Sequence, residues 1–337
     1  MLFDRSGPGW NYESLVVLND RTLGMRAIIA IDSTQRGPGF GGIRRIAYPT
    51  EDDALRDALA LASAMTTTTA LAQLPAGGAK TVVLHREGLE LEPIYLRLGE
   101  AIERLGGRYV CGPDLGTGAQ ELAWVRQVTS HVNPAENDAG VSTARGVMAG
   151  LRAMWAHLDL EPAGSTVAVQ GCGSVGLSLI EQLRAMRVRV IAADTSASAV
   201  RGAKAAGAEV VAPSRIVETP CDVLVPCAVG GTITMSAVSE LRCRGICGSA
   251  NNQLREPAVA LALQERGIAH APDVIVSAGA VIEGVLTVAQ GQTPGADAIG
   301  QAIDRVEATT AEVLAESASS GQPPSIVALH RAQRLLG

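Results

Sequence analysis

The stretch VAVQGCGSVGLSLIEQL, residues 167–183, constrains the fold of this chain more than any other part of the sequence. An apolar run that predicts a buried strand leads directly into a glycine-rich turn, and the residues after the turn have the pattern of an amphipathic helix. Strand, glycine turn and helix together form the first half of a βαβ unit. Helices and strands continue to alternate to about residue 250, which predicts a parallel sheet with crossover helices.

The glycines of this turn have the spacing G-x-G-x-x-G, which suits the binding of a dinucleotide. Gly171 permits the tight turn, Gly173 lets the backbone approach a pyrophosphate, and Gly176 lets the helix pack on the strand. Ser174 and Val175 complete the turn at the helix N-terminus, which faces the anion. A purely structural turn is the alternative, but the strand before it and the helix after it favour a dinucleotide site.

A carboxylate ends the next predicted strand, VIAAD, and bears on which dinucleotide is bound. Asp194 would accept hydrogen bonds from the adenosine ribose hydroxyls and would repel a 2′-phosphate. The residue that follows, Thr195, is uncharged, so the pattern favours NAD over NADP. The alternative is that Asp194 only caps the next helix.

The first part of the chain has a different pattern and predicts a second domain. The expected elements are a strand over 23–32, a glycine-rich loop over 36–45, a helix over 50–67, a strand over 81–84, a helix over 93–107 and a strand running into a loop over 108–118. We therefore expect an α/β fold with two domains. The first domain is expected over residues 1–136 and the second after it.

Length and composition agree with this division and exclude several classes of function. A chain of 337 residues suggests two domains, and its net charge of −6 comes without a basic run that would mark a nucleic-acid or membrane partner. The N-terminal sequence lacks the pattern of a signal peptide, and no apolar run is long enough to span a bilayer. The six cysteines lack the spacing of a zinc site or a disulfide framework. We therefore expect a cytoplasmic protein with reduced thiols and no metal.

Lys80 is the one charged side chain within residues 65–84. Desolvation disfavours the charged form of a buried amine, so a lysine in an apolar, glycine-lined pocket is suited to act as a base. Asp114, in the loop sequence GPDLGTG, follows a predicted strand at a position where an acid can face a cleft. The alternatives are a Lys80 whose amine reaches solvent and an Asp114 that caps a helix, and composition rejects neither.

Seven motifs together make the sequence resemble the glutamate, leucine, phenylalanine and valine dehydrogenases, with the greatest similarity to the leucine and phenylalanine branch. These motifs are GPGFGGIRR, LPAGGAK, GPDLGTG, GCGSVG, CAVGGTI, GSANNQL and VIVSAGAVIEG. They occur in the order typical of the family and cover nearly the whole chain. The resemblance is therefore much more specific than the glycine turn alone.

The resemblance implies an oligomeric enzyme that catalyses NAD-dependent oxidative deamination of an α-amino acid, reversible as reductive amination. It also implies a substrate-binding and oligomerisation domain over 1–136, an NAD-binding Rossmann domain over 137–318, and a C-terminal segment over 319–337 that packs back on the first domain, with an active-site cleft between the two domains. It implies that Lys80 activates the water that attacks an iminium carbon, and that Asp114 exchanges protons with the substrate amine. The implied substrate-binding residues are Gly41, Gly42, Met65, Thr68 and Asn252. The implied cofactor-binding residues are Gly171, Gly173, Ser174, Val175, Gly176, Asp194, Thr195, Cys227, Ala228 and Asn251.

At Thr68 the sequence departs from the family, which has a lysine there that pairs with the α-carboxylate of the substrate. A buried carboxylate left without its cation costs about 3–5 kcal/mol, and even the low end corresponds to roughly a 10²-fold loss in rate or affinity. Three resolutions stay open. In the first, Arg45 supplies the cation; the alternative for this residue is an exposed or interface arginine. In the second, the substrate lacks the carboxylate, which would make this protein an amine dehydrogenase or reductive aminase. In the third, the chain binds NAD without efficient catalysis.

Two further departures lie in the last motif, where Ser277 and Ala280 replace an asparagine and a glycine typical of the family. The resemblance places them near the nicotinamide and the hinge. Aromatic residues make up only 3% of the chain, which suits a pocket for an aliphatic side chain. The leading expectation is a homo-oligomeric, leucine dehydrogenase-like enzyme that acts on an aliphatic α-amino acid.

Overall fold

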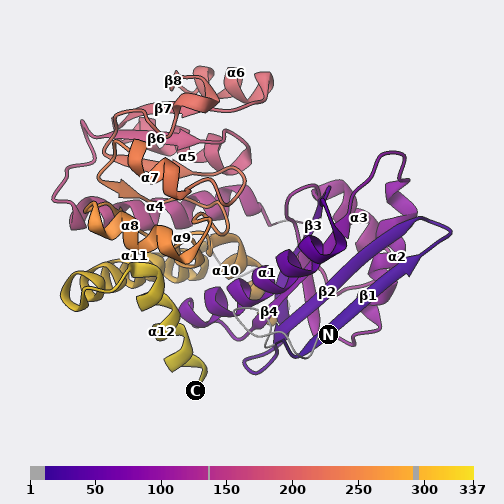
Figure 1. Ribbon diagram of the computed structural model, residues 1–337. Coiled ribbons are helices and arrows are strands. Elements are labelled where there is room, and N and C mark those ends of the chain that lie inside the picture. Colours follow the sequence, from indigo (N-terminus) through magenta and orange to yellow (C-terminus); the bar gives the residue numbers. More distant parts are fainter. Residues whose placement is uncertain (1–11, 136, 291–295) are drawn as a thin grey trace. The chain divides into compact units, whose positions relative to one another are not determined.

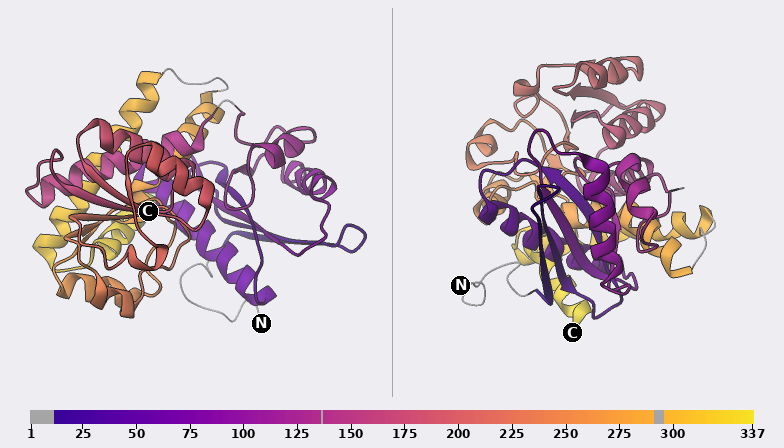
Figure 2. Two further views of the ribbon diagram at one scale, coloured as in Figure 1. Left: turned by 90° about the horizontal axis from the view of Figure 1, so that it is seen from above. Right: turned by 90° about the vertical axis from the view of Figure 1, so that its right-hand side faces the viewer.

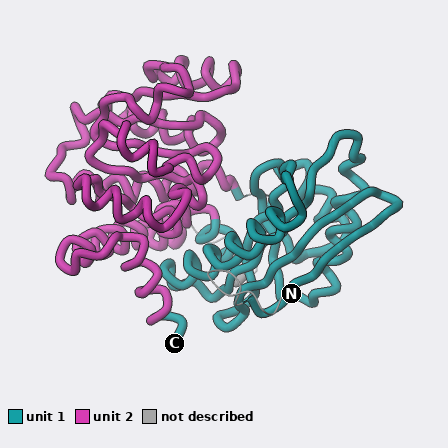
Figure 3. The backbone as a smooth tube through the Cα atoms, viewed as in Figure 1, with its two compact units in different colours: residues 1–137, 281–294, 335–337 teal, residues 138–280, 295–334 magenta. Residues whose placement is uncertain are grey.

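The computed structural model describes residues 12–135, 137–290 and 296–337 (Figure 1). The chain divides into two compact units (Figure 3). Unit 1 comprises residues 1–137, 281–294 and 335–337, and unit 2 comprises residues 138–280 and 295–334. Both units combine helices with a sheet.

Unit 1 contains a five-stranded sheet with the strand order β1-β2-β4-β3-β5. The strands are β1 (Ser14–Asp20), β2 (Met25–Ser33), β3 (Gly39–Ile46), β4 (Gly77–Leu84) and β5 (Tyr109–Gly112). Strand β2 pairs antiparallel with β1 and β4, whereas β3 is parallel to both of its neighbours, β4 and β5.

Helices cover both faces of this sheet (Figure 1 and Figure 2). Helix α1 (Glu51–Leu71) packs on β4 and β2, and alanines and leucines of the helix form one core with Ile28, Ala30 and Val82. Helices α2 (Leu91–Glu103) and α3 (Ala119–Arg126) enclose the core on the other face. As the sequence predicts, α1 begins with a cap in which Thr50 accepts a hydrogen bond from the backbone N–H of Asp53.

The prediction of a glycine-rich loop over 36–45 is wrong, because most of this segment forms β3 in the interior of the sheet. A Cβ atom on Gly41 would lie 1.7 Å from the carbonyl oxygen of Ala79. The glycine is therefore needed for the close approach of two neighbouring strands rather than for a turn. Strand β4 also begins at Gly77 rather than at the expected Thr81.

Unit 2 contains a six-stranded parallel sheet with the order β11-β10-β9-β6-β7-β8. The strands are β6 (Thr166–Gln170), β7 (Arg189–Ala193), β8 (Glu209–Val210), β9 (Val223–Pro226), β10 (Gly245–Ile246) and β11 (Ala269–His270). This is the strand order of the Rossmann fold, in which a dinucleotide binds where the order reverses, here between β6 and β9. The predicted α/β class with a Rossmann-like unit is confirmed.

The helices of unit 2 precede, connect and follow these strands. They are α4 (Ala139–His157), α5 (Ser174–Ala185), α6 (Ala197–Ala205), the 3-10 helix η2 (Pro213–Arg215), α7 (Met235–Glu240), α8 (Pro257–Glu265), α9 (Asp273–Val276) and α11 (Ala296–Ser320). Helix α10 (Gly279–Gln290) and helix α12 (Pro324–Leu336) each contain residues of both units.

Near the C-terminus, the Leu336 carbonyl oxygen accepts a hydrogen bond of 2.8 Å from the side chain of Gln35, and both residues belong to unit 1. Among the described residues, none of the helices has the length and apolar character needed to cross a membrane.

Candidate active site and dinucleotide site

A buried ion pair joins the two residues expected to be catalytic. Lys80 lies in β4 and Asp114 follows β5, and the Lys80 Nζ atom is 2.5 Å from the Asp114 Oδ2 atom. The side chains are only 3% and 8% exposed, so Lys80 does not extend its amine into solvent. Asp114 does not cap α3 either, because the N-cap of that helix is Gly118.

The glycine at position 42 allows the acid to approach the sheet. Strand β3 lies between β4 and β5, and Gly42 pairs with Gly112, two residues before Asp114. A Cβ atom on Gly42 would lie 2.3 Å from the Pro113 carbonyl oxygen and 2.9 Å from the Asp114 Cβ atom. The absence of a side chain therefore lets the turn that carries Asp114 fold over β3.

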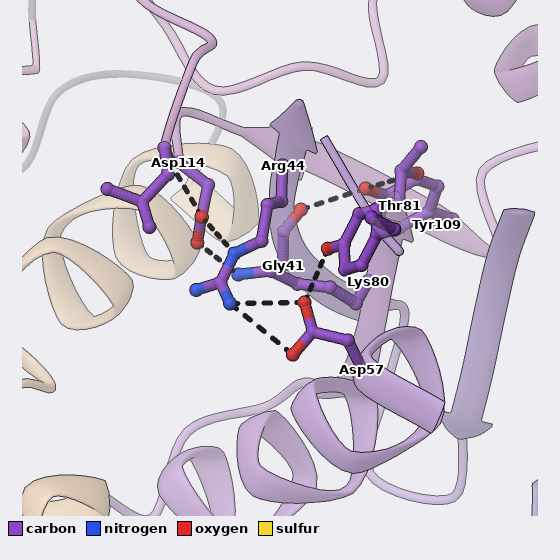
Figure 4. A network of polar contacts seen from close by, with 9 residues as sticks. Gly41, Arg44, Asp57, Lys80, Thr81, Tyr109 and Asp114 are labelled. Carbon is purple, nitrogen blue, oxygen red and sulfur yellow. Dashed lines mark hydrogen bonds and ion pairs between the residues drawn. The ribbon is translucent and has the colours of Figure 1, made fainter. Parts of the chain in front are cut away.

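Arg44, also in β3, extends the ion pair into a network of alternating charges (Figure 4). Its Nε atom is 2.7 Å from Asp114 Oδ1, and its Nη1 atom is 3.2 Å from Asp57 Oδ2 in α1. The Tyr48 hydroxyl donates a hydrogen bond of 2.5 Å to the same Asp57 oxygen. Two cations and two carboxylates thus neutralise one another in a cluster between the sheet and α1.

The surroundings of Asp114 keep its carboxylate ionised. Burial by itself would raise the pKa of Asp114, but the charges of Lys80 and Arg44 and their hydrogen bonds lower that pKa well below its usual value. The backbone N–H of Leu115 donates a further hydrogen bond of 2.6 Å to Asp114 Oδ1. Asp114 is therefore a carboxylate at neutral pH.

Three of the four consecutive threonines use their hydroxyls within the fold, whereas Thr68 does not. Thr66 donates to Asp32 Oδ2, Thr67 donates to the Ser63 carbonyl oxygen, and Thr69 donates to the Thr66 carbonyl oxygen. Thr68 is 4% exposed, and its hydroxyl makes no hydrogen bond with another residue in the described part of the chain. Met65 lies one helical turn earlier, and its Cγ atom would be 3.4 Å from a Cβ atom on Gly41. Met65 therefore lies close to β3.

The structure does not bring Arg45 to the ion pair. Successive side chains of a strand point to opposite faces, and Arg45 contacts residues of α2 and α3 where Arg44 contacts α1. Arg45 Nη2 pairs with Glu121 Oε1 at 3.3 Å, and its Nε atom donates to the Tyr95 hydroxyl. The expectation that Arg45 replaces the missing lysine has no support from this geometry, and we do not retain it.

In unit 2 the glycine turn has the features that a pyrophosphate requires. Gly171 has a φ of 94°, which favours glycine, and a Cβ atom on Gly176 would lie 2.0 Å from the Gly171 carbonyl oxygen. A Cβ atom on Gly173 would meet nothing within 4 Å, so this glycine borders open space at the start of α5. Ser174 beside it is exposed, while Val175 is half-buried. The N-terminal N–H groups of α5 lack a side-chain cap, which suits an anion.

Asp194 lies at the end of β7, next to this turn. Its carboxylate accepts hydrogen bonds of 2.7 Å from the backbone N–H of Cys172 and of 2.7 Å from that of Ser196. The cap of α6 is Ser196, so capping is not the role of Asp194. Thr195 is exposed. The carboxylate is therefore held beside the glycine turn, where a ribose would lie.

The remaining expected cofactor residues also lie in unit 2. A Cβ atom on Gly171 would be 2.9 Å from the Ala228 Cβ atom and 2.9 Å from the Cys227 carbonyl carbon, which places this dipeptide against the turn. Asn251 and Asn252 follow β10. Asn252 is exposed, has a φ of 51° and donates its backbone N–H to Asp273 Oδ2 at 2.8 Å.

Sequence reasoning missed Asp57 and Tyr48, and it gave no role to Arg44. The period of two in a strand was a usable signal for Arg44, which shares a face with Gly42 two residues earlier. No comparable signal exists for Asp57, because its pairing depends on how α1 packs over β3. Among the described residues, no group of three or more histidine, cysteine or acidic side chains is arranged to hold a metal.

Comparison with known proteins identifies the family. Residues 15–131 match a family model described as the dimerisation domain of Glu/Leu/Phe/Val dehydrogenase. Residues 137–205 and 192–323 match the model described as Glutamate/Leucine/Phenylalanine/Valine dehydrogenase. Together these matches cover most of the chain.

Individual relatives agree with the family models. The chain is 37% identical to a leucine dehydrogenase of Thermoactinomyces intermedius over 81% of its own length and 77% of that protein. It is 36% identical to a valine dehydrogenase of Streptomyces coelicolor, over 94% and 90% of the two chains. The crystal structure of L-tryptophan dehydrogenase from Nostoc punctiforme superposes with a TM-score of 0.79 and 28% identity, over 97% of this chain and 96% of that one.

These matches confirm the predicted class of enzyme, an amino acid dehydrogenase acting on CH–NH2 donors. The chain belongs to the Glu/Leu/Phe/Val dehydrogenase family.

Proposed function

We propose that this protein catalyses the NAD-dependent oxidative deamination of an aliphatic α-amino acid and the reverse reductive amination. The observation that carries the proposal is the buried pair of Lys80 in β4 and Asp114 after β5, which are joined at 2.5 Å. Buried opposite charges of this kind are found where a site holds a proton donor and a proton acceptor in fixed positions. The names of the relatives, leucine and valine dehydrogenase, support an aliphatic substrate.

The residues of unit 2 fit NAD. The first-turn N–H groups of α5 suit the pyrophosphate, and the open space at Gly173 leaves room for it. The Asp194 carboxylate is suited to accept hydrogen bonds from two ribose hydroxyls, and its charge would repel a 2′-phosphate. When bound, the nicotinamide would take the hydride that leaves the α-carbon.

The residues of unit 1 would handle the protons. Loss of hydride leaves an iminium carbon on the substrate, water adds to that carbon, and ammonia leaves as the keto acid forms. Lys80 would first release its own proton to solvent and would then take the proton of the attacking water. Asp114, as a carboxylate, would accept a hydrogen bond from the substrate amine.

A second candidate function is the oxidation of an amine that lacks the α-carboxylate. It is favoured by the neutral Thr68 and by the placement of the neighbouring arginines. Arg45 pairs with Glu121 on the other face of the sheet, and the charge of Arg44 is already shared by Asp114 and Asp57. Neither arginine offers an unpaired charge to a substrate carboxylate.

A homo-oligomer is also proposed. The match of residues 15–131 to a family model described as a dimerisation domain supports it.

All six cysteines are free thiols. A cytoplasmic location of the protein stays a prediction.

A matched panel of substrates tests the proposed function. Leucine, valine and isoleucine are each compared with the amine that results from their decarboxylation, with NAD, and formation of reduced cofactor is measured. Faster turnover of the amino acids supports the first function, and faster turnover of the amines supports the second. No turnover with either set would contradict both, and would favour a homologue that binds the dinucleotide without catalysis.

A further inference from the structure

Arg44 belongs to the network of charges around Asp114. Arg44 is 11% exposed and contacts two carboxylates, one from the loop after β5 and one from α1. Burial would lower the pKa of Arg44, but the charges of Asp114 and Asp57 outweigh burial and raise it. The guanidinium is therefore a permanent charge in this cluster.

The two oxygens of the Asp114 carboxylate are held by different partners. Oδ1 accepts from Arg44 Nε at 2.7 Å and from the Leu115 N–H at 2.6 Å, whereas Oδ2 faces Lys80 Nζ at 2.5 Å. In Figure 4, dashed lines join the carboxylate to both cations. Rotation of the carboxylate would exchange these contacts, so the bonds from Arg44 and from the Leu115 N–H together determine which oxygen is presented to Lys80.

Arg44 is itself held from the helix side. Asp57 contacts its Nη1 atom through both carboxylate oxygens, at 3.2 Å and 3.4 Å, and Tyr48 donates to Asp57. A guanidinium with partners on two edges has little rotational freedom. The orientation of Asp114 is thereby tied to the packing of α1 on the sheet.

We propose that Arg44 is a positioning residue for the reaction, which holds one oxygen of Asp114 so that the other stays directed at Lys80. The proposal builds on the proposed function, because it concerns the same pair. Arg44 itself contacts neither substrate nor cofactor in this role. It acts through Asp114, and Asp57 acts through Arg44.

Comparison of Arg44→Gln with Arg45→Gln provides a matched test. The two arginines are neighbours in β3, are similarly buried with 11% and 14% exposure, and each pairs with an acid, but they lie on opposite faces of the sheet. In Arg44→Gln the bond that holds Asp114 Oδ1 is lost, and a catalytic group that is displaced loses rate even when the fold is intact. We therefore expect kcat to fall by roughly 10–10²-fold, with a smaller change in KM.

Arg45→Gln should keep kcat close to the wild-type value, because Arg45 lies on the other face of the sheet. Arg44→Lys keeps the charge but loses the fork, so its kcat should lie between those of the wild type and Arg44→Gln. A wild-type kcat in Arg44→Gln, or an equal fall in both glutamine variants, would overturn the proposal.

A second readout does not require turnover. Asp114→Asn is combined with Arg44→Gln and, separately, with Arg45→Gln, and thermal midpoints are measured for the single and double variants. The effects of residues in contact are not additive, whereas those of separated residues are. The shifts of the thermal midpoint should be non-additive when Asp114→Asn is combined with Arg44→Gln and additive when it is combined with Arg45→Gln. Additive shifts in both double variants would contradict the contact between Arg44 and Asp114. If the substrate panel gives no turnover, the proposed function fails while this thermal test still decides the contact.

Discussion

At the scale of single residues, the site is a chain of alternating charges in which each group stabilises the next. Lys80, Asp114, Arg44 and Asp57 carry two positive and two negative charges within hydrogen-bond distance of one another. Because the cluster is already neutral, it offers no unpaired cation to a third carboxylate. We propose that Thr68, which is buried and neutral, decides whether a substrate carboxylate is accepted.

Thr68→Lys tests the environment of the substrate directly. If an α-carboxylate lies beside this position, the new ammonium should raise kcat/KM for amino acids by roughly 10²-fold, since a buried carboxylate without a cation costs several kcal/mol. If the substrate lacks the carboxylate, the variant should bury an unpaired charge, lower turnover of amines and reduce the thermal midpoint. Thr67→Lys, at a less buried neighbouring position on α1, is the control.

A buried histidine predicts sensitivity to acid. His270 in β11 is 2% exposed, and burial lowers its pKa from 6.5 to about 4. The unfolded chain binds a proton at higher pH than the folded one, so stability is present above pH 6.5 and is lost as the pH falls toward 4. The loss should reach about 3 kcal/mol.

His270→Gln should remove most of this dependence while retaining a polar group for Gln253. The measurement is the free energy of unfolding in urea at several pH values between 4 and 7, for the wild type and the variant. Parallel curves for the two proteins would contradict the assignment to His270.

How far the sequence predicts the site depends on whether a residue is defined by local spacing. Lys80 and Asp114 could be singled out because each lies at a strand-to-glycine junction with few other charges. Arg45 was chosen over Arg44 because sequence comparison shows only which residue is unusual, whereas the face of a strand decides which residue reaches the pair. Asp57 could not be predicted, because its partner is 13 residues away in another element.

At the scale of elements, glycines serve different purposes that sequence alone does not distinguish. The segment 36–45 was predicted to be a loop from its glycine content, yet β3 uses Gly41 and Gly42 to admit the backbone of neighbouring segments. In the β6–α5 turn the same residue type gives a positive φ at Gly171 and open space at Gly173. Only tertiary packing separates these cases.

Two alanine substitutions in the β6–α5 turn should separate folding from binding. A Cβ atom at position 173 meets nothing within 4 Å, so Gly173→Ala should change stability by less than about 0.5 kcal/mol. It should nevertheless weaken NADH binding by about tenfold or more, because the new methyl group occupies space needed by the pyrophosphate.

Gly176→Ala should instead destabilise the fold by about 1–3 kcal/mol, since its Cβ atom would lie 2.0 Å from the Gly171 carbonyl oxygen. The thermal midpoint and NADH fluorescence titration are measured for both variants. Full NADH affinity in Gly173→Ala would argue against a pyrophosphate at this turn.

At the scale of the whole molecule, the longest periodic segments were the most predictable. Helices α1 and α2 and strands β2 and β6 match the hydrophobic patterns in the sequence. Strand β11 and helices α7 to α9 have two to nine residues and were not predicted, because they are short and no motif like the glycine turn after β6 marks them. The order of the parallel strands was predictable in outline, because right-handed crossovers leave few arrangements for alternating helices and strands.

The central claim is that the amine of Lys80 takes part in the chemical step rather than in binding the dinucleotide. The most direct measurement is NADH formation by Lys80→Ala on the best substrate of the panel, together with NADH affinity by fluorescence titration. The account predicts a fall in turnover of roughly 10²–10⁴-fold with unchanged cofactor affinity. Turnover equal to that of the wild type would contradict it.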